Sequence, residues 1–202
     1  MQRLAALLFF SMLLSLCAHA QGASTPLLPT HSITHPGKAA LIMLPVNTPQ
    51  EFHASSRHGF VLVALSDSDL LIDTQLIKVL AGASLKLAGK GVHTLRSLEP
   101  SALQIVLVRI DTAKQSLTIS KTSLDPGGQS EDASDRNDTL VIALSSLTLR
   151  DVRDLGESDG PWKSAPPTTI SVTPGHFFWL KPGMHRLTNL GRTKAGFVSI
   201  EW

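Results

Sequence analysis

Short runs of apolar residues, mainly β-branched and aliphatic, recur along most of the chain. Four examples are FVLVAL at 60–65, LQIVLVRI at 103–110, TLVIAL at 139–144 and GFVSIEW at 196–202. Gly, Pro, Asp and Ser separate the runs at short intervals, which is typical of antiparallel β-sandwiches and barrels. One segment, DTQLIKVLAGASLKL at 73–87, also has spacing that suits a helix.

An internal repeat argues against that helix. RHGFVLVALS at 57–66 aligns with RNDTLVIALS at 136–145, at an offset of 79 residues, and GVHTLRSL at 91–98 aligns with GMHRLTNL at 183–190, at an offset of 92. Matched blocks in a preserved order indicate a tandem structural repeat. The repeat predicts that the second part of segment 73–87 is a strand.

The two offsets differ by 13 residues, so the second copy carries about that many extra residues between its matched blocks. They fall in DVRDLGESDGPWKSAPPTT at 151–169, where Gly-Pro and Pro-Pro steps oppose regular strand pairing. We therefore expect a lengthened hairpin loop in the second copy.

The N-terminal residues have the pattern of an export signal. Arg3 precedes a long apolar run, and Ala18 and Ala20 give a small-x-small ending, so residues 1–20 are predicted to be a signal peptide. Lipidation of Cys17 is the alternative, which the bulky Leu16 before it disfavours. The repeat then predicts an N-terminal arm at 21–36, a first barrel at 37–112 and a second barrel at 113–202.

Cleavage would remove Cys17, the only cysteine, so the mature protein would depend on a hydrophobic core and not on disulfides. The chain has 18 Lys and Arg against 16 Asp and Glu, with no basic tract, so nucleic acid is not an expected partner. No later apolar run approaches the roughly 20 residues that span a bilayer. We expect a secreted or periplasmic protein, and a homodimer is conceivable.

The second copy contains a motif that resembles one of the two motifs of the cupin superfamily. That motif is usually written as Gly, five residues, then P-x-G-x-x-H-x-x-x-N. This chain has Gly175, six residues, Pro182-Gly183, one residue, His185 and Asn189, so the spacer between Gly183 and His185 is one residue short.

The first copy has a related block, in which Gly91, His93 and Ser97 take the motif positions. Two such repeats resemble a two-domain cupin (bicupin). The resemblance implies an all-β protein of two tandem jelly-roll barrels, each a double-stranded β-helix, over roughly residues 37–202.

Strand geometry gives the motif histidine a direction. After the Pro182-Gly183 turn, His185, Leu187 and Asn189 alternate onto one face of a strand, which faces inward in a barrel. An inward imidazole is either a metal ligand or a hydrogen-bonded core residue, and the sequence leaves both readings open.

The resemblance also implies a candidate metal site in the first barrel. The other cupin motif supplies ligands as H-x-H, three or four residues, then Glu. Here Glu51, His53 and His58 keep that spacing, with Glu and one His exchanged. Together with His93 they would suit a divalent metal such as Mn, Fe, Ni or Zn. EFHASSRH at 51–58 also reads as an ordinary polar loop.

In the second barrel only His185 of the usual four ligands remains, so this barrel is predicted to be metal-free and to act as a structural partner of the first. Within HFFWL at 176–180, alternation puts Phe177 and Trp179 on one face and Phe178 on the other. Both faces are apolar, so we expect core packing, and one face could cover the neighbouring barrel.

The function expected from these observations is small-ligand binding in the first barrel, with isomerase or dioxygenase chemistry at a metal if the protein is an enzyme. The alternative is a metal-free, non-enzymatic cupin-like protein. A carbohydrate-binding sandwich is a third idea, disfavoured by three Trp and no Tyr. The mature sequence has no Cys nucleophile, no G-x-S-x-G motif and no phosphate loop.

Overall fold

The computed structural model describes residues 39–87, 89–112, 117–134, 138–154 and 164–201, and for 131–134 it describes the backbone alone. The predicted signal peptide and N-terminal arm lie outside these ranges. All described residues belong to one contact unit, Ile33–Trp202. Within the described ranges no helix has the length and apolar character needed to cross a bilayer.

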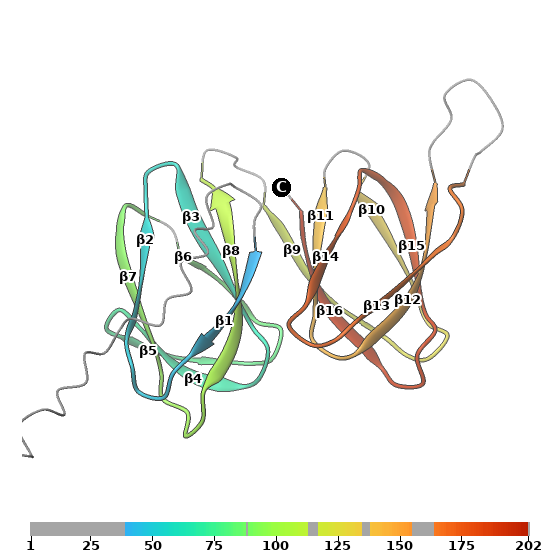
Figure 1. Cartoon of the computed structure of the whole chain (residues 1–202). Coiled ribbons are helices and arrows are strands. Elements are labelled where there is room, and N and C mark those ends of the chain that lie inside the picture. The colour runs from blue at the N-terminus through green and yellow to red at the C-terminus, as the bar shows by residue number, and fades with distance from the viewer. Residues whose placement is uncertain (1–38, 88, 113–116, 135–137, 155–163, 202) are drawn as a thin grey trace, which may run out of the picture. The chain divides into compact units, whose positions relative to one another are not determined.

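Every regular element in these ranges is a β-strand, as the sequence predicted (Figure 1). The first half contains β1 (Ala39–Leu44), β2 (Gln50–Ala54), β3 (His58–Ala64), β4 (Ser68–Ile72), β5 (Gln75–Val79), β6 (Ser84–Leu87), β7 (Gly91–Ser97) and β8 (Leu103–Asp111). The second half contains β9 (Thr118–Leu124), β10 (Gln129–Ser134), β11 (Thr139–Ala143), β12 (Leu147–Asp154), β13 (Thr168–Val172), β14 (Phe177–Leu180), β15 (Gly183–Asn189) and β16 (Ala195–Glu201).

The strands form four antiparallel sheets, two in each half. The first half has the orders β1-β8-β3-β6 and β2-β7-β4-β5, and the second has β9-β16-β11-β14 and β10-β15-β12-β13. Each second-half strand occupies the place of the strand eight earlier in the chain. The expected pair of jelly-roll barrels is thereby confirmed.

Segment 73–87 forms β5 and β6, which belong to different sheets. The helical reading of this segment is therefore wrong, and the strand predicted for its second part is present. A β-turn at Leu80–Ala83 separates the two strands, closed by a hydrogen bond from the Ala83 N–H to the Leu80 carbonyl.

Three apolar clusters hold the fold together. One lies between the two sheets of the first half and includes Phe52, Leu62 and Leu95, and a second fills the second half in the same way. The third is built from β3 and β8 of the first half and β11 and β16 of the second. These four strands are buried on both faces, which explains their nearly continuous apolar runs.

β14 contributes to two of these clusters. Phe177 packs against the cluster between the halves, while Phe178 packs against the core of the second half. Core packing of HFFWL is therefore observed, and for Phe177 the alternative that the sequence left open, contact with the other half, is observed as well.

Two glycines mark equivalent contacts between the halves. Gly82 (φ +78°) is so close to the second half that a Cβ would lie 2.6 Å from Leu144 Cδ1, and a Cβ on Gly175 (φ +79°) would lie 2.9 Å from Leu65 Cδ1. Leu65 and Leu144 are themselves equivalent in the repeat. Each half therefore presents a glycine turn to the same leucine of the other half, as in a two-fold symmetric dimer interface.

Candidate ligand pocket in the second half

The structure does not direct Glu51 and His53 into the first barrel. Phe52 and Ala54, which alternate with them on β2, are buried in the first core. Because neighbouring residues of a strand face opposite sides, Glu51 and His53 lie exposed on the outer face. The candidate ligands Glu51 and His53 therefore do not face the interior of the first barrel.

His58 and His93 are also separately engaged. His58 begins β3, and its Nδ1 lies 3.2 Å from the hydroxyl of Ser55 in the preceding turn. His93 points inward from β7, opposite Phe52, with Nδ1 3.2 Å from Asp73 Oδ2. Its Nε2 is enclosed and has no hydrogen-bond partner.

These positions do not fit a metal. Among the residues that the structure describes, no three His, Cys, Asp or Glu side chains come together in a group that could hold an ion. The set of Glu51, His53, His58 and His93 is divided between the outer face, a turn and the barrel interior. The Mn, Fe, Ni or Zn that the resemblance implied therefore has no ligand set in the described part of the chain.

The second half differs from the first chiefly in one hairpin. In the first half two residues join Ile72 of β4 to Gln75 of β5, and at the equivalent place sixteen residues, 152–167, join Asp151 to Thr168. This agrees with the predicted insertion. β12 uses part of the extra length to continue along β15 as far as Asp154.

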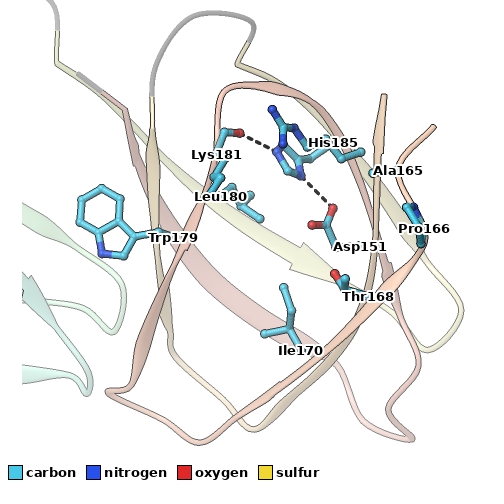
Figure 2. Close-up of a pocket in the computed structure, with 10 residues that line it drawn as sticks. Asp151, Ala165, Pro166, Thr168, Ile170, Trp179, Leu180, Lys181 and His185 are labelled. Atoms are coloured by element: carbon cyan, nitrogen blue, oxygen red, sulfur yellow. Dashed lines mark hydrogen bonds and ion pairs between the residues drawn. The ribbon is translucent and has the colours of Figure 1, made fainter. Parts of the chain in front are cut away.

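The extension forms one wall of a pocket with a volume of about 330 Å³. The pocket lies between β12, β13 and the turn that joins β14 to β15 (Figure 2). Its lining residues are Asp151, Arg153, Ala165, Pro166, Thr168, Ile170, Trp179, Leu180, Lys181 and His185. In Figure 2 Trp179 lies apart from the other labelled side chains.

His185 and Asp151 form a buried pair in this pocket, with 5% and 9% of their surfaces exposed. His185 Nδ1 lies 2.8 Å from Asp151 Oδ1, and Nε2 lies 2.7 Å from the carbonyl oxygen of Lys181 (Figure 2). A carbonyl and a carboxylate only accept, so both ring nitrogens must donate. This geometry favours the imidazolium form of His185, in which both nitrogens carry a proton.

The pKa of His185 follows from competing causes. Burial lowers it, but the hydrogen bonds to Asp151 and to the Lys181 carbonyl, with the attraction of the Asp151 charge, outweigh burial and raise the pKa above its usual value. With both nitrogens donating, His185 has no lone pair for a metal. Of the two readings that the sequence left open, the structure supports the hydrogen-bonded one.

Arg153 lies beside His185 because the two residues are opposite each other in the β12–β15 pairing. Its Nη2 donates to the Pro182 carbonyl, while its Nε is enclosed without a partner. Gly183 (φ +134°) leaves room for this side chain, since a Cβ there would lie 2.8 Å from Arg153 Nε. The Pro-Gly turn of the motif therefore makes space for Arg153 as well as starting β15.

Asn189, the last residue of the motif, has a structural role. It is buried, its amide donates to the carbonyls of Leu124 (3.0 Å) and Thr193 (2.8 Å), and its Oδ1 accepts from the Gly191 N–H (2.8 Å). These bonds tie the β15–β16 turn to the end of β9.

Sequence reasoning missed Asp151, Arg153 and Lys181. For the first two a signal was present, since Asp151 and Arg153 continue the alternation of the buried Leu147 and Leu149 in LTLRDVRD. This alternation places both side chains on the inner face of β12. The signal was missed because the whole stretch 151–169 was predicted to be a loop.

No family model matches this sequence, and no curated protein matches it. Solved structures do match. Oxalate decarboxylase from Lactobacillus farciminis, in a formate complex, aligns with a TM-score of 0.59 at 8% identity over 81% of this chain and 75% of that one. A mutant of Bacillus subtilis oxalate decarboxylase aligns at 0.59 and 10% identity over 84% and 69%.

The Ylba protein from E. coli aligns with a TM-score of 0.55 at 12% identity over 81% of this chain and 76% of its own. At these identities the matches establish the fold and no reaction. The aligned regions span 81–84% of this chain and therefore include both repeats. The chain has the fold of the two-domain cupins.

Proposed function

We propose that this protein binds a small organic molecule in the pocket of its second half, and that it does so without a bound metal. The observation that carries the proposal is the pocket itself, about 330 Å³ in volume, with the charged Asp151–His185 pair on its lining. Small-molecule sites commonly combine a concave, largely apolar wall with a few fixed polar groups.

The composition of the lining supports this reading. Ala165, Pro166, Ile170 and Leu180 supply apolar surface, and Thr168 adds a hydroxyl. The polar groups are held in place, because the two bonds of His185 join β12 to the β14–β15 turn. A site whose shape exists before the ligand arrives loses little entropy on binding.

The ligand is thus assigned to the second half, and not to the first half that the sequence predicted. The equivalent hairpin of the first half has only Asp73 and Thr74 in place of residues 152–167, so it lacks counterparts of Arg153, Ala165 and Pro166. Export remains part of the proposal and rests on the N-terminal sequence.

A fragment screen by protein-observed NMR tests the proposal. Binders should shift the backbone amides of Arg153, Thr168 and His185 more than amides of the first half. Ile170→Trp should weaken binding at least tenfold by filling the pocket. Ile77→Trp is the matched control, because Ile77 occupies the same place on β5 as Ile170 on β13.

Two outcomes would count against pocket binding. One is a screen in which no fragment shifts the three amides, and the other is a set of binders that Ile77→Trp weakens as much as Ile170→Trp. The shifts of the unmodified protein give an answer even if Ile170→Trp fails to fold.

A further inference from the structure

The charges around the pocket do not balance. Four lining residues are ionisable: Asp151, Arg153, Lys181 and His185. Asp151 and His185 neutralise each other across 2.8 Å. Arg153 and Lys181 then remain, and among the described residues neither forms a salt bridge to an acidic side chain.

Lys181 is exposed to solvent, so the partly enclosed portion of this excess charge is that of Arg153. Arg153 is half-buried, and the positive charge of Arg153 acts to lower the pKa of the neighbouring His185. Between two cations in a site of reduced dielectric, repulsion is stronger than in water. A ligand with negative charge would relieve it, while a cationic ligand would increase it.

Arg153 also has unused hydrogen-bonding capacity. A guanidinium carries five N–H donors in a planar fork. The one bond that its side chain makes to described residues goes from Nη2 to the Pro182 carbonyl, and Nε has no acceptor. The same planar fork is suited to bidentate bonds with the oxygens of a carboxylate or phosphate.

The remaining lining is apolar, so an inorganic anion would leave most of the pocket unfilled. Ala165, Pro166, Ile170 and Leu180 require a ligand with a carbon skeleton. We propose that the pocket is selective for an organic anion whose charged group lies against Arg153 and whose apolar body lies along Ile170 and Leu180. This inference rests on the proposed function and adds the chemical class of the ligand.

The test compares a charged probe with its neutral isostere. Benzoate, phenyl phosphate and benzamide have the same ring, and each can be titrated into the ¹⁵N-labelled full chain while the amides of Arg153 and His185 are followed. We expect one or both anions to bind at least tenfold more tightly than benzamide. Stronger binding of benzoate than of phenyl phosphate would identify the anion as a carboxylate, and the reverse order a phosphate ester.

Variants of β12 supply the second arm. Arg153→Gln should weaken binding of the preferred anion about 10- to 100-fold, the loss of roughly 1.5–3 kcal/mol for a hydrogen bond to a charged group. Arg150→Gln is the matched control, because Arg150 lies three residues earlier on the same strand with its side chain exposed. It should change the affinity less than twofold.

The outcomes separate this inference from the proposed function. If benzamide bound as tightly as the anions with shifts in the pocket, pocket binding would stand and selectivity for anions would be overturned. If Arg150→Gln and Arg153→Gln weakened binding equally, general surface charge would explain the effect and the role of Arg153 would be overturned. If none of the probes bound while neutral fragments did, the inference would again fail alone. The comparison of isosteres with unmodified protein does not depend on the folding of any variant.

Discussion

The histidines of the two motif blocks show how strongly the role of one residue depends on the acceptors around it. His93 and His185 occupy equivalent positions and both meet an aspartate. The partner of His93 is Asp73, in the turn after β4, and the two atoms are 3.2 Å apart. The partner of His185 is Asp151, within β12, at 2.8 Å. Only His185 has an acceptor for its second nitrogen as well.

The raised pKa of His185 predicts that stability depends on pH. A group whose pKa is higher in the folded than in the unfolded state stabilises the fold fully below its unfolded value, near 6.5, and loses that effect as pH rises through the folded pKa. We expect the free energy of unfolding to decrease as pH rises above about 6.5. Urea unfolding at intervals from pH 5.5 to 9 measures it.

The same measurement on His185→Gln provides the comparison, since this variant should lose the part of the pH dependence that comes from titration of His185. His176→Gln is the control, because His176 is exposed and lies outside the pocket lining. Equal slopes in wild type and His185→Gln would contradict the charged pair.

Asp151→Asn tests the same pair by removing the negative charge of Asp151. It would leave the buried imidazolium without its counter-charge, and breaking a buried pair in this way costs about 3–5 kcal/mol. We expect a loss of that size at pH 6, and a smaller loss at pH 9, where His185 can be neutral. A loss independent of pH would show that Asp151 acts by packing alone.

Asn189→Ala should also be strongly destabilising. The substitution removes three hydrogen bonds, one of them to the buried Leu124 carbonyl of β9, which we expect to cost about 3 kcal/mol. Ser97, the equivalent residue, accepts one bond from the Glu99 N–H at 3.2 Å, so Ser97→Ala should cost about 1 kcal/mol. Chemical denaturation of both variants checks the order, and equal losses would contradict it.

At the scale of elements, the apolar runs, the repeat and the motif were enough to predict the fold. The runs mark strands, and a repeat with one loop insertion leaves few other topologies. The direction of β2 was harder, because a shift of one residue exchanges its two faces. In EFHA the apolar Phe52 and Ala54 do indicate the inner face, and the family spacing of Glu51, His53 and His58 competed with that indication.

The pocket could not be derived from sequence in the same way, because it depends on where paired strands end. Continuing β12 beyond Asp151 is what places Arg153 opposite His185. The alternation through Asp151 and Arg153 is compatible with a continued strand, but the Gly and Pro residues that follow favour a loop, and the sequence alone does not decide between the two.

Replacing the lengthened hairpin should separate fold from pocket. We expect a chain in which residues 152–167 are replaced by Asp-Gly to fold, since a two-residue turn joins the same positions in the first half and Asp-Gly suits a two-residue hairpin. Circular dichroism should remain that of a β protein. Fragment binding should disappear, because Arg153, Ala165 and Pro166 are removed. Binding that survived would place the ligand elsewhere.

At the scale of the whole molecule, the two halves share a core and should behave as one cooperative unit. The cluster between them contains Val61, Val63, Val106, Val108, Ile110, Leu140, Ile142, Val198 and Ile200, and all of them except Ile110 are fully buried. Separating the halves would expose this apolar surface to water, at a cost of about 25 cal/mol for each Å². That cost couples the stability of one half to the presence of the other.

The tryptophans allow this coupling to be measured. All three, Trp162, Trp179 and Trp202, lie in the second half of the sequence, so fluorescence follows that half while far-UV circular dichroism follows both. In wild type we expect the two urea transitions to coincide.

Leu140→Asp puts a charge into the shared core and should separate the two transitions, with the fluorescence transition at the lower urea concentration. Leu149→Ala is the control: it lies in the core of the second half alone, so it should lower the midpoint by an amount that reflects about 2–5 kcal/mol and leave the transitions coincident. Transitions that already differ in wild type would show that the shared core does not couple the halves.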